Sequence, residues 1–350
     1  MQVDPSAREA KLEAMHENLT NAVAALVTGE DWRRAIEFAA HFRSRSFNNT
    51  LLIYAQHYAA FQEGRVPERT PSYVAGFKQW LSLGRHVTKG QSGYQILAPV
   101  TARFASPTPA VEGSWRRLAR GERPGAGEAI RSRLVGLRPA YVWDVSQTSG
   151  DPIPERPRPQ LLQGQSPAGL WDGLAAQLES RGFTLRMVPN AGVIGGAHGL
   201  TDYLARAVSV RADMDPAAQV KTLGHELAHV MLHGPDNVEA TLHRGVAEVE
   251  AESVALMIGA AHGMDTRDYT VPYVSSWADS VSGKSPVEVV KATAERVRAA
   301  AIEVLDKLDT HQVGDGDPPG LERETSRAAG RPARPARLVE VAQPAEAVAL

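Results

Sequence analysis

The chain has 350 residues, 43% hydrophobic and 22% charged, so it can bury a core and its length favours two domains. Its 40 acidic and 38 basic side chains leave a formal net charge of -2, which excludes a chain-wide basic excess for nucleic-acid binding. The sequence has no cysteine, which excludes disulfide frameworks, thiolate metal sites and cysteine nucleophiles. The charged N-terminus and the lack of a long apolar run predict a cytoplasmic protein that has no signal peptide and no membrane contact.

Residues 7–105 are expected to form an α+β domain. Apolar residues spaced three and four positions apart predict helices over 7–27, 31–43 and 48–61, and a shorter helix is expected after Pro71. From Arg85 the pattern changes to two strands around a glycine turn.

Residues 106–165 differ in composition from the rest of the chain. Eight arginines and three glutamates lie between positions 103 and 138, with proline and glycine among them, which predicts a flexible insertion. A short strand is expected at 141–145, and the proline-rich stretch 151–165 is interpreted as an interdomain linker.

Residues 166–311 are expected to form the second domain, and residues 312–350, which have few large apolar side chains, a disordered tail. Asp215 followed by Pro216 is typical of a helix start. The predicted elements are helices at 166–181, 216–233, 241–262 and 286–308, and strands at 184–188 and 205–211.

An HExxH sequence, His225 to His229, lies inside the predicted helix 216–233. Four residues of a helix turn through about 400°, so both imidazoles project from one face and can bind Zn²⁺. Glu226 is then the candidate catalytic residue, because its carboxylate can take a proton from a water activated by zinc. The alternative is a helix with two surface histidines that bind nothing.

A zinc hydrolase of this kind needs a third protein ligand. Leu232 and Pro235 exclude the metzincin spacing, and the next predicted helix offers Glu248, Glu250 and Glu252. Glu248 and Glu252 lie about 40° apart on the helical wheel, whereas Glu250 faces away. We assign Glu248 as the third ligand and Glu252 as the carboxylate that orients a ligand histidine. Two alternatives stay open: Glu252 as the ligand, and a solvated helix face.

Two further features accompany the HExxH helix. His233 is interpreted as a cation near the helix C-terminus rather than a metal ligand. The strand at 205–211 is expected to be an edge strand that pairs with an extended peptide, which predicts a protein substrate.

Aromatic and basic side chains alternate in the N-terminal part. Between positions 30 and 104, ten Lys or Arg residues stand against five acids, which fits a platform for stacked bases with a rim for phosphates. The alternative is that these aromatic residues belong to the core. The candidate contacts are Phe47, Tyr73, Phe77, Lys78, Trp80, Arg85 and Lys89.

Several N-terminal segments, read together, resemble a known domain. Residues 46–53 (SFNNTLLI), 71–80 (PSYVAGFKQW), 83–85 and 87–93 are similar to the single-stranded-DNA-binding domain of ArdC-type antirestriction proteins, over roughly residues 10 to 105. The resemblance implies that Asn48 and Asn49 also contact single-stranded DNA.

The second half also resembles a family domain. Residues 166–275 are similar to the ImmA/IrrE-type zinc metallopeptidase domain, with its HExxH at 225–229 and its downstream glutamate at Glu248. The resemblance implies an α+β protein with an ArdC-like domain followed by a zincin-like, gluzincin-type domain. It also implies a protein of a mobile genetic element that helps incoming single-stranded DNA survive restriction.

Two other functions remain open. The chain could be a single-stranded-DNA-binding protein whose metal site is structural or inactive. It could also be an ImmA/IrrE-like regulatory protease that cleaves a repressor.

Overall fold

The computed structural model describes residues 5–153, 164–237, 243–267, 269, 274–279, 281 and 283–321. It is a mixed α+β structure, as expected. Contacts between residues divide the chain into a larger unit, Met1–Ala98 with Leu137–Leu321, and a smaller unit that contains Pro99–Gly136. Residues 154–163 of the predicted linker lie outside the described residues.

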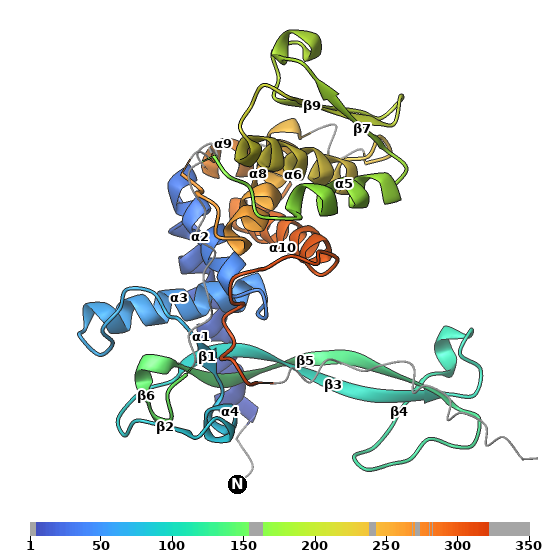
Figure 1. Ribbon diagram of the computed structural model, residues 1–350. Coiled ribbons are helices and arrows are strands. Elements are labelled where there is room, and N and C mark those ends of the chain that lie inside the picture. The colour runs from blue at the N-terminus through green and yellow to red at the C-terminus, as the bar shows by residue number, and fades with distance from the viewer. Residues whose placement is uncertain are drawn as a thin grey trace, which may run out of the picture. The chain divides into compact units, whose positions relative to one another are not determined.

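The helices follow the predicted order along the chain (Figure 1). They are α1 (Pro5–Ala24), α2 (Gly29–His41), α3 (Phe47–Gln62), α4 (Phe77–Ser82), α5 (Leu170–Ser180), α6 (Pro216–Leu232), α8 (Arg244–Ala261), α9 (Val274–Ala278) and α10 (Pro286–Leu305). Short 3-10 turns occur at Glu112–Ser114, Val145–Gln147 and Ala191–Ile194. Within the described residues, no helix has the length and apolar character needed to cross a membrane.

In the described part of the chain, the strands form three sheets. They are β1 (Val74–Ala75), β2 (Arg85–Val87), β3 (Tyr94–Ser106), β4 (Arg116–Arg117), β5 (Ala129–Asp144), β6 (Thr148–Gly150), β7 (Thr184–Val188), β8 (Gly199–Asp202) and β9 (Ala207–Arg211). The sheet orders are β1-β5-β3-β4, β2-β6 and β7-β9-β8.

Capping side chains explain where several helices begin. The Asp215 side chain accepts a hydrogen bond from the backbone of Ala218, and Pro216 occupies the first turn of α6, as the sequence predicts. Thr28 and Asp31 form a capping box at α2, in which each side chain accepts from the backbone of the other residue. These starts are local, so the sequence alone locates them well.

The N-terminal helices and the C-terminal helices share one hydrophobic core. Trp32 of α2 is completely buried, and its indole N–H donates a hydrogen bond of 2.8 Å to the Ser253 hydroxyl on α8. The Trp32 ring also packs on Trp277 and Phe47, with ring centroids 5.2 and 6.2 Å away. Residues of both predicted domains, 7–105 and 166–311, therefore belong to the larger unit and share its core.

The strand expected at the edge of the C-terminal sheet lies in its centre. Strand β9 pairs with β7 in parallel and with β8 in antiparallel orientation, so both of its edges are occupied. The prediction that residues 205–211 bind an extended peptide is therefore wrong. The sequence analysis missed the short strand β8, which occupies the edge position instead.

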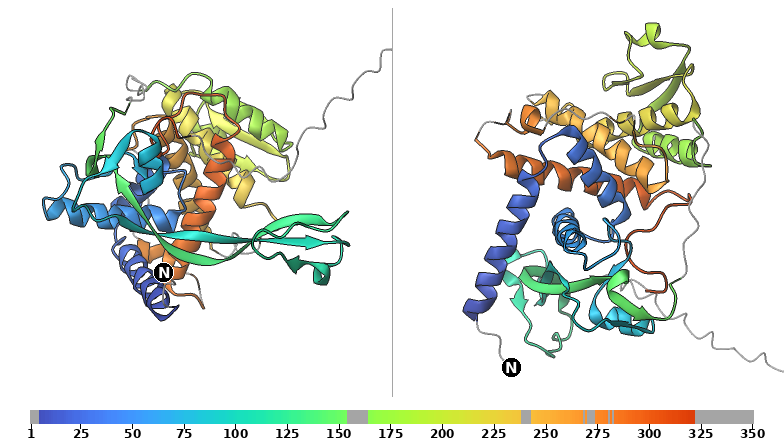
Figure 2. Two further views of the ribbon diagram at one scale, coloured as in Figure 1. Left: turned by 90° about the horizontal axis from the view of Figure 1, so that it is seen from below. Right: turned by 90° about the vertical axis from the view of Figure 1, so that its left-hand side faces the viewer.

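The predicted flexible insertion contains regular structure. It includes the end of β3, strand β4 and the first part of β5, and β3 and β5 are neighbours in one sheet (Figure 2). Ion pairs hold its turns: Arg116 binds Glu122 and Glu128, and Arg131 binds Glu112. The composition suggested a loop, but three of its arginines form ion pairs with its glutamates.

The predicted disordered tail begins with an ordered segment, so this prediction is wrong for residues 312–321. The backbone N–H of Val313 donates to Ala261 O at 2.7 Å, and that of Val74 donates to Gly316 O at 2.8 Å. Arg45 pairs with Asp317 at 2.9 Å. Backbone hydrogen bonds and an ion pair hold this segment, so it needs few large apolar side chains. Residues 322–350 lie outside the described residues.

Candidate metal centre and nucleic-acid surface

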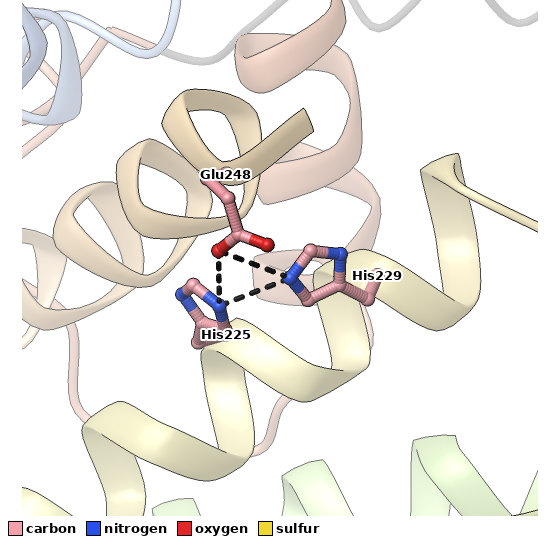
Figure 3. Close-up of side chains that lie close together, drawn as sticks. All are labelled: His225, His229 and Glu248. Atoms are coloured by element: carbon pink, nitrogen blue, oxygen red, sulfur yellow. Dashed lines mark hydrogen bonds and ion pairs between the residues drawn. The ribbon is translucent and has the colours of Figure 1, made fainter. Parts of the chain in front are cut away.

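Helices α6 and α8 pack against each other and bring the HExxH sequence to the predicted third ligand. The Nε2 atoms of His225 and His229 lie 3.0 Å apart. Glu248 Oε2 lies 3.5 Å from His225 Nε2 and 3.7 Å from His229 Nε2. Figure 3 shows the Glu248 carboxylate of one helix pointing at both imidazoles of the other.

These three donor atoms fit a divalent metal ion. Zinc binds histidine nitrogen and carboxylate oxygen at about 2.0–2.1 Å in a tetrahedron, which puts neighbouring donors about 3.3 Å apart. The observed separations of 3.0, 3.5 and 3.7 Å bracket that value. Two imidazoles and one carboxylate leave a fourth position open, as catalytic zinc sites do.

Glu252 lies where the predicted orienting carboxylate is needed. Its Oε2 is 3.3 Å from His225 Nδ1, and its Oε1 is 2.9 Å from the ammonium of Lys221. Burial by itself lowers the pKa of His225, but the carboxylates of Glu248 and Glu252 outweigh it and raise that pKa to about 9. The pair of carboxylates therefore stabilises positive charge, whether a proton or a metal ion, at this imidazole.

A second chain of contacts supports His229. His229 Nδ1 lies 2.9 Å from His233 Nδ1, and His233 Nε2 lies 2.9 Å from Glu250 Oε2. Arg296 donates to Glu250 Oε1 at 2.6 Å. His233 lies at the C-terminal end of α6, as predicted, and its partner is a buried carboxylate. Glu250 faces away from the three donors, as predicted. The sequence analysis missed its contact with His233. The available signal was the spacing of His233 four residues after His229.

Glu226 is nearly buried between α6 and the edge strand β8. Its Oε2 accepts a hydrogen bond of 2.6 Å from the Thr201 hydroxyl. The carboxylate also lies close to Gly199, where an added Cβ would be 2.6 Å from Glu226 Oε1. The strand therefore holds this carboxylate in place without offering it a positive partner.

A cavity of about 1000 Å³ joins these groups. It is lined by both histidines, Glu226, Glu248 and the β8 residues Gly199–Thr201, among others. Tyr203 also lines it and donates a hydrogen bond of 2.8 Å to the carbonyl of His229. Burial, with the charge of Glu226 adding to it, raises the pKa of Tyr203 to about 12, so this hydroxyl stays a donor.

Two predicted DNA contacts are core residues. Phe47 and Trp80 have no exposed surface. Phe47 packs on Trp32, and the Trp80 indole donates a hydrogen bond of 3.0 Å to Trp143 O. Their prediction as stacking residues is wrong, because neighbouring side chains and backbone cover both rings and a base cannot reach them.

Two more predicted contacts hold the fold together. The Asn49 side chain makes two hydrogen bonds, of 3.0 and 2.8 Å, with the backbone of Leu97. Arg85 binds the Thr148 side chain and backbone at the neighbouring strand β6. Both side chains are therefore already engaged in joining strands to the rest of the unit. Asn48 is half-buried at the start of α3.

The other predicted contacts are accessible. Phe77 is 49% exposed, Lys78 and Lys89 are exposed, and Tyr73 is half-buried. The Phe77 ring meets Trp143 edge-on at 6.2 Å. Trp143 was missed, although the strand predicted at 141–145 contains it.

A second accessible aromatic site lies around Tyr54 and Tyr73. A cavity of about 790 Å³ is lined by the rings of Phe38, Tyr54 and Tyr73 and by the guanidinium groups of Arg34 and Arg69. Phe38 and Tyr54 pack with ring centroids 5.1 Å apart. We call this cavity the aromatic groove.

Comparison with known proteins finds a family match for the N-terminal part of the chain. Residues 10–126 match the family model of the N-terminal domain of anti-restriction factor ArdC. An uncharacterised protein of Bacillus anthracis is 23% identical over 319 residues, which cover 86% of this chain and 52% of that protein. The chain thus spans about half the length of the curated relative that it matches.

Two solved structures are also similar. The metal-free crystal structure of the antirestriction ArdC protein from the R388 plasmid is 16% identical with a TM-score of 0.46, and the match covers 83% of this chain and 97% of that one. The Mn(II)-bound structure of the same protein is 16% identical with a TM-score of 0.42, covering 75% and 88%.

Proposed function

We propose that this chain, whose residues 10–126 match the family model of the ArdC N-terminal domain, is an anti-restriction protein that binds single-stranded DNA and hydrolyses peptide bonds at its metal centre. One observation supports the hydrolase most strongly: Glu226 shares a cavity with the donor atoms of His225, His229 and Glu248. A structural metal site would need neither the cavity nor the nearby carboxylate.

The residues around the cavity can be given roles. A divalent ion such as Zn²⁺ at the three donors would polarise a substrate carbonyl and lower the pKa of a water molecule. Glu226 would accept a proton from the attacking water on its carboxylate and pass it to the nitrogen of the departing amine. Thr201 would keep the carboxylate oriented meanwhile, through its hydrogen bond to Oε2.

The edge strand β8 supports a protein substrate. Among the residues that the structure describes, β8 pairs with β9 alone, so its other edge can bind the backbone of an extended peptide. Its residues Gly199–Thr201 line the same cavity as Glu226. A peptide paired with this edge would therefore pass the candidate metal centre.

Glu226→Gln tests the hydrolase. We expect proteolysis of unfolded protein substrates, followed by mass spectrometry with added Zn²⁺ or Mn²⁺, to fall by at least about 100-fold, because the general base is lost. Metal affinity, measured by calorimetry, should persist because all three ligands remain. The exposed Glu179→Gln serves as the control. Equal proteolysis by Glu226→Gln and the wild-type protein would contradict the proposal.

The aromatic groove supports binding of single-stranded DNA. Three half-buried residues, Phe38, Tyr54 and Tyr73, line this cavity together with Arg34 and Arg69. Unpaired bases stack on such rings regardless of sequence, and the arginines attract the backbone phosphates. The groove thus takes over the stacking role that Phe47 and Trp80 cannot fill.

Fluorescence anisotropy with a labelled single-stranded oligonucleotide tests this binding. Tyr73→Leu should weaken binding by about 5- to 150-fold, the range for losing one stacked base. The control is Leu185→Met in the C-terminal sheet, which leaves the groove untouched. A chelator should leave the affinity unchanged. If the wild-type protein does not bind the oligonucleotide at low salt, the DNA proposal fails and a regulatory protease becomes the better reading.

A further inference from the structure

The smaller unit of the chain is unusually basic. Residues 99–136 contain seven arginines, three glutamates and no lysine or aspartate, whereas the whole chain has a net charge of -2. They form the outer parts of β3 and β5, strand β4 and the turns between them. We call residues 99–136 the arginine ribbon.

All three glutamates of the arginine ribbon form ion pairs with its arginines. Glu112 pairs with Arg131 at 2.9 Å and with Arg133 at 3.3 Å. Glu122 and Glu128 both pair with Arg116, and each also accepts a backbone N–H of its own turn. The acids therefore hold the turns in place and do not neutralise the remaining arginines.

Four arginines remain without such partners: Arg103, Arg117, Arg120 and Arg123. All four are exposed, and none makes an ion pair or side-chain hydrogen bond within the part of the chain that the structure describes. Their positive charges on the arginine ribbon therefore face solvent. Such a concentration of like charge attracts a polyanion, because an anionic partner offsets the repulsion between the guanidinium groups.

Aromatic rings lie between the arginines. The Arg131 guanidinium lies 4.0 Å from the ring centre of Trp115, and that of Arg133 lies 6.0 Å from the ring centre of Phe104. Phe104 is directly opposite Arg117 in the β3–β4 register, so both side chains are on one face. This face combines cations with rings, as polynucleotide-binding surfaces do.

We propose that the arginine ribbon binds the phosphodiester backbone of DNA as a second contact in addition to the aromatic groove, an inference that rests on the DNA binding proposed above. Guanidinium groups match phosphate oxygens in shape and charge, which makes arginine suited to this contact. A two-stranded ribbon is also narrow enough to enter the major groove of a duplex. The contact reads charge rather than sequence, because phosphates are the same at every position.

The salt dependence of binding tests the ribbon. Full-length protein would be titrated with labelled single-stranded and duplex oligonucleotides over a salt series. For wild-type protein, the logarithm of the association constant should fall linearly with the logarithm of salt concentration. In Arg120→Gln/Arg123→Gln, the slope should become shallower by about 1.4 for single strands or about 1.8 for a duplex, because two phosphate contacts are lost. The strand type that shows the change identifies the ligand.

A matched variant controls for net charge. Lys11→Gln/Arg186→Gln removes two exposed positive charges from α1 and β7, and we expect its slope to equal that of the wild-type protein. The ribbon proposal is overturned if the two double variants have equal slopes, or if polyglutamate competes as well as unlabelled DNA. If Tyr73→Leu loses binding while Arg120→Gln/Arg123→Gln keeps the salt slope of the wild-type protein, the aromatic groove is the DNA site instead.

Discussion

His229 Nδ1 lies 2.9 Å from His233 Nδ1, so one of these two imidazoles on neighbouring turns donates a hydrogen bond to the other. If His229 binds a metal through Nε2, its Nδ1 carries the hydrogen and donates it to His233. His233 Nε2 then donates to Glu250, which is itself held by Arg296. The chain of contacts fixes the tautomer and the ring orientation of His229.

This geometry predicts that His233→Ala lowers metal affinity by about 10- to 100-fold, the usual effect of losing a residue that orients a ligand. Isothermal calorimetry with Zn²⁺ would measure it, and thermal unfolding of the metal-free protein would show whether the fold is affected. The exposed His311→Ala is the matched control. Equal affinity of His233→Ala and His311→Ala would show that the contact has no part in metal binding.

The close approach of β8 to Glu226 predicts a role for Gly199. A Cβ at this position would lie 2.6 Å from Glu226 Oε1 and 2.7 Å from Thr222 Cγ2. Gly199→Ala should therefore displace the carboxylate, slow proteolysis and lower the free energy of unfolding by about 1–3 kcal/mol. Denaturant unfolding and the proteolysis assay would measure the two effects. Gly113→Ala, where an added Cβ meets nothing within 4 Å, should change neither.

The ordered segment 312–321 predicts that Gly316 stabilises the larger unit. Gly316 has a φ of +88°, and its Cβ would lie 2.5 Å from Phe42 Cδ1. Gly316→Ala combines backbone strain with this clash, and we expect a loss of about 2–4 kcal/mol in unfolding free energy. Gly64→Ala has φ +71° and no neighbour within 4 Å, so it reports the strain alone at about 1 kcal/mol. Equal losses in the two variants would mean that the segment does not pack on Phe42 in solution.

Buried histidines predict that acid destabilises the protein. Burial lowers the pKa of His57 below its ordinary value, more than the charge of Asp144 raises it. Burial likewise lowers the pKa of His262. A histidine whose pKa is lower in the folded state contributes stability above its unfolded pKa of about 6.5 and loses that stability as pH falls through the folded value.

The unfolding midpoint should therefore drop between about pH 7 and pH 5. In His57→Gln the drop should be smaller, since the amide can still donate to Glu68 O, as His57 Nε2 does at 2.9 Å, but does not titrate. His16→Gln, an exposed position, should keep the wild-type pH profile. Identical profiles for all three proteins would contradict the prediction.

The sequence by itself determined the elements whose signals are local. The helix start at Asp215 and Pro216 and the strand at 184–188 were predictable, because caps and periodicity act over a few residues. The same is true of the two histidines of the HExxH sequence, which α6 places on one face. The arrangement of Glu248 and Glu252 on α8 followed from helix geometry as well.

Only the tertiary structure decided which side chains are covered and which partners they meet. Trp80 and Phe77 lie three residues apart on α4, yet Trp80 is buried under the backbone of Trp143 while Phe77 is exposed. Glu250 meets His233 only because α6 packs on α8. Such contacts join positions far apart in the chain, so local composition does not predict them. The arginine-rich stretch resembles a loop in composition, although parts of it pair as strands.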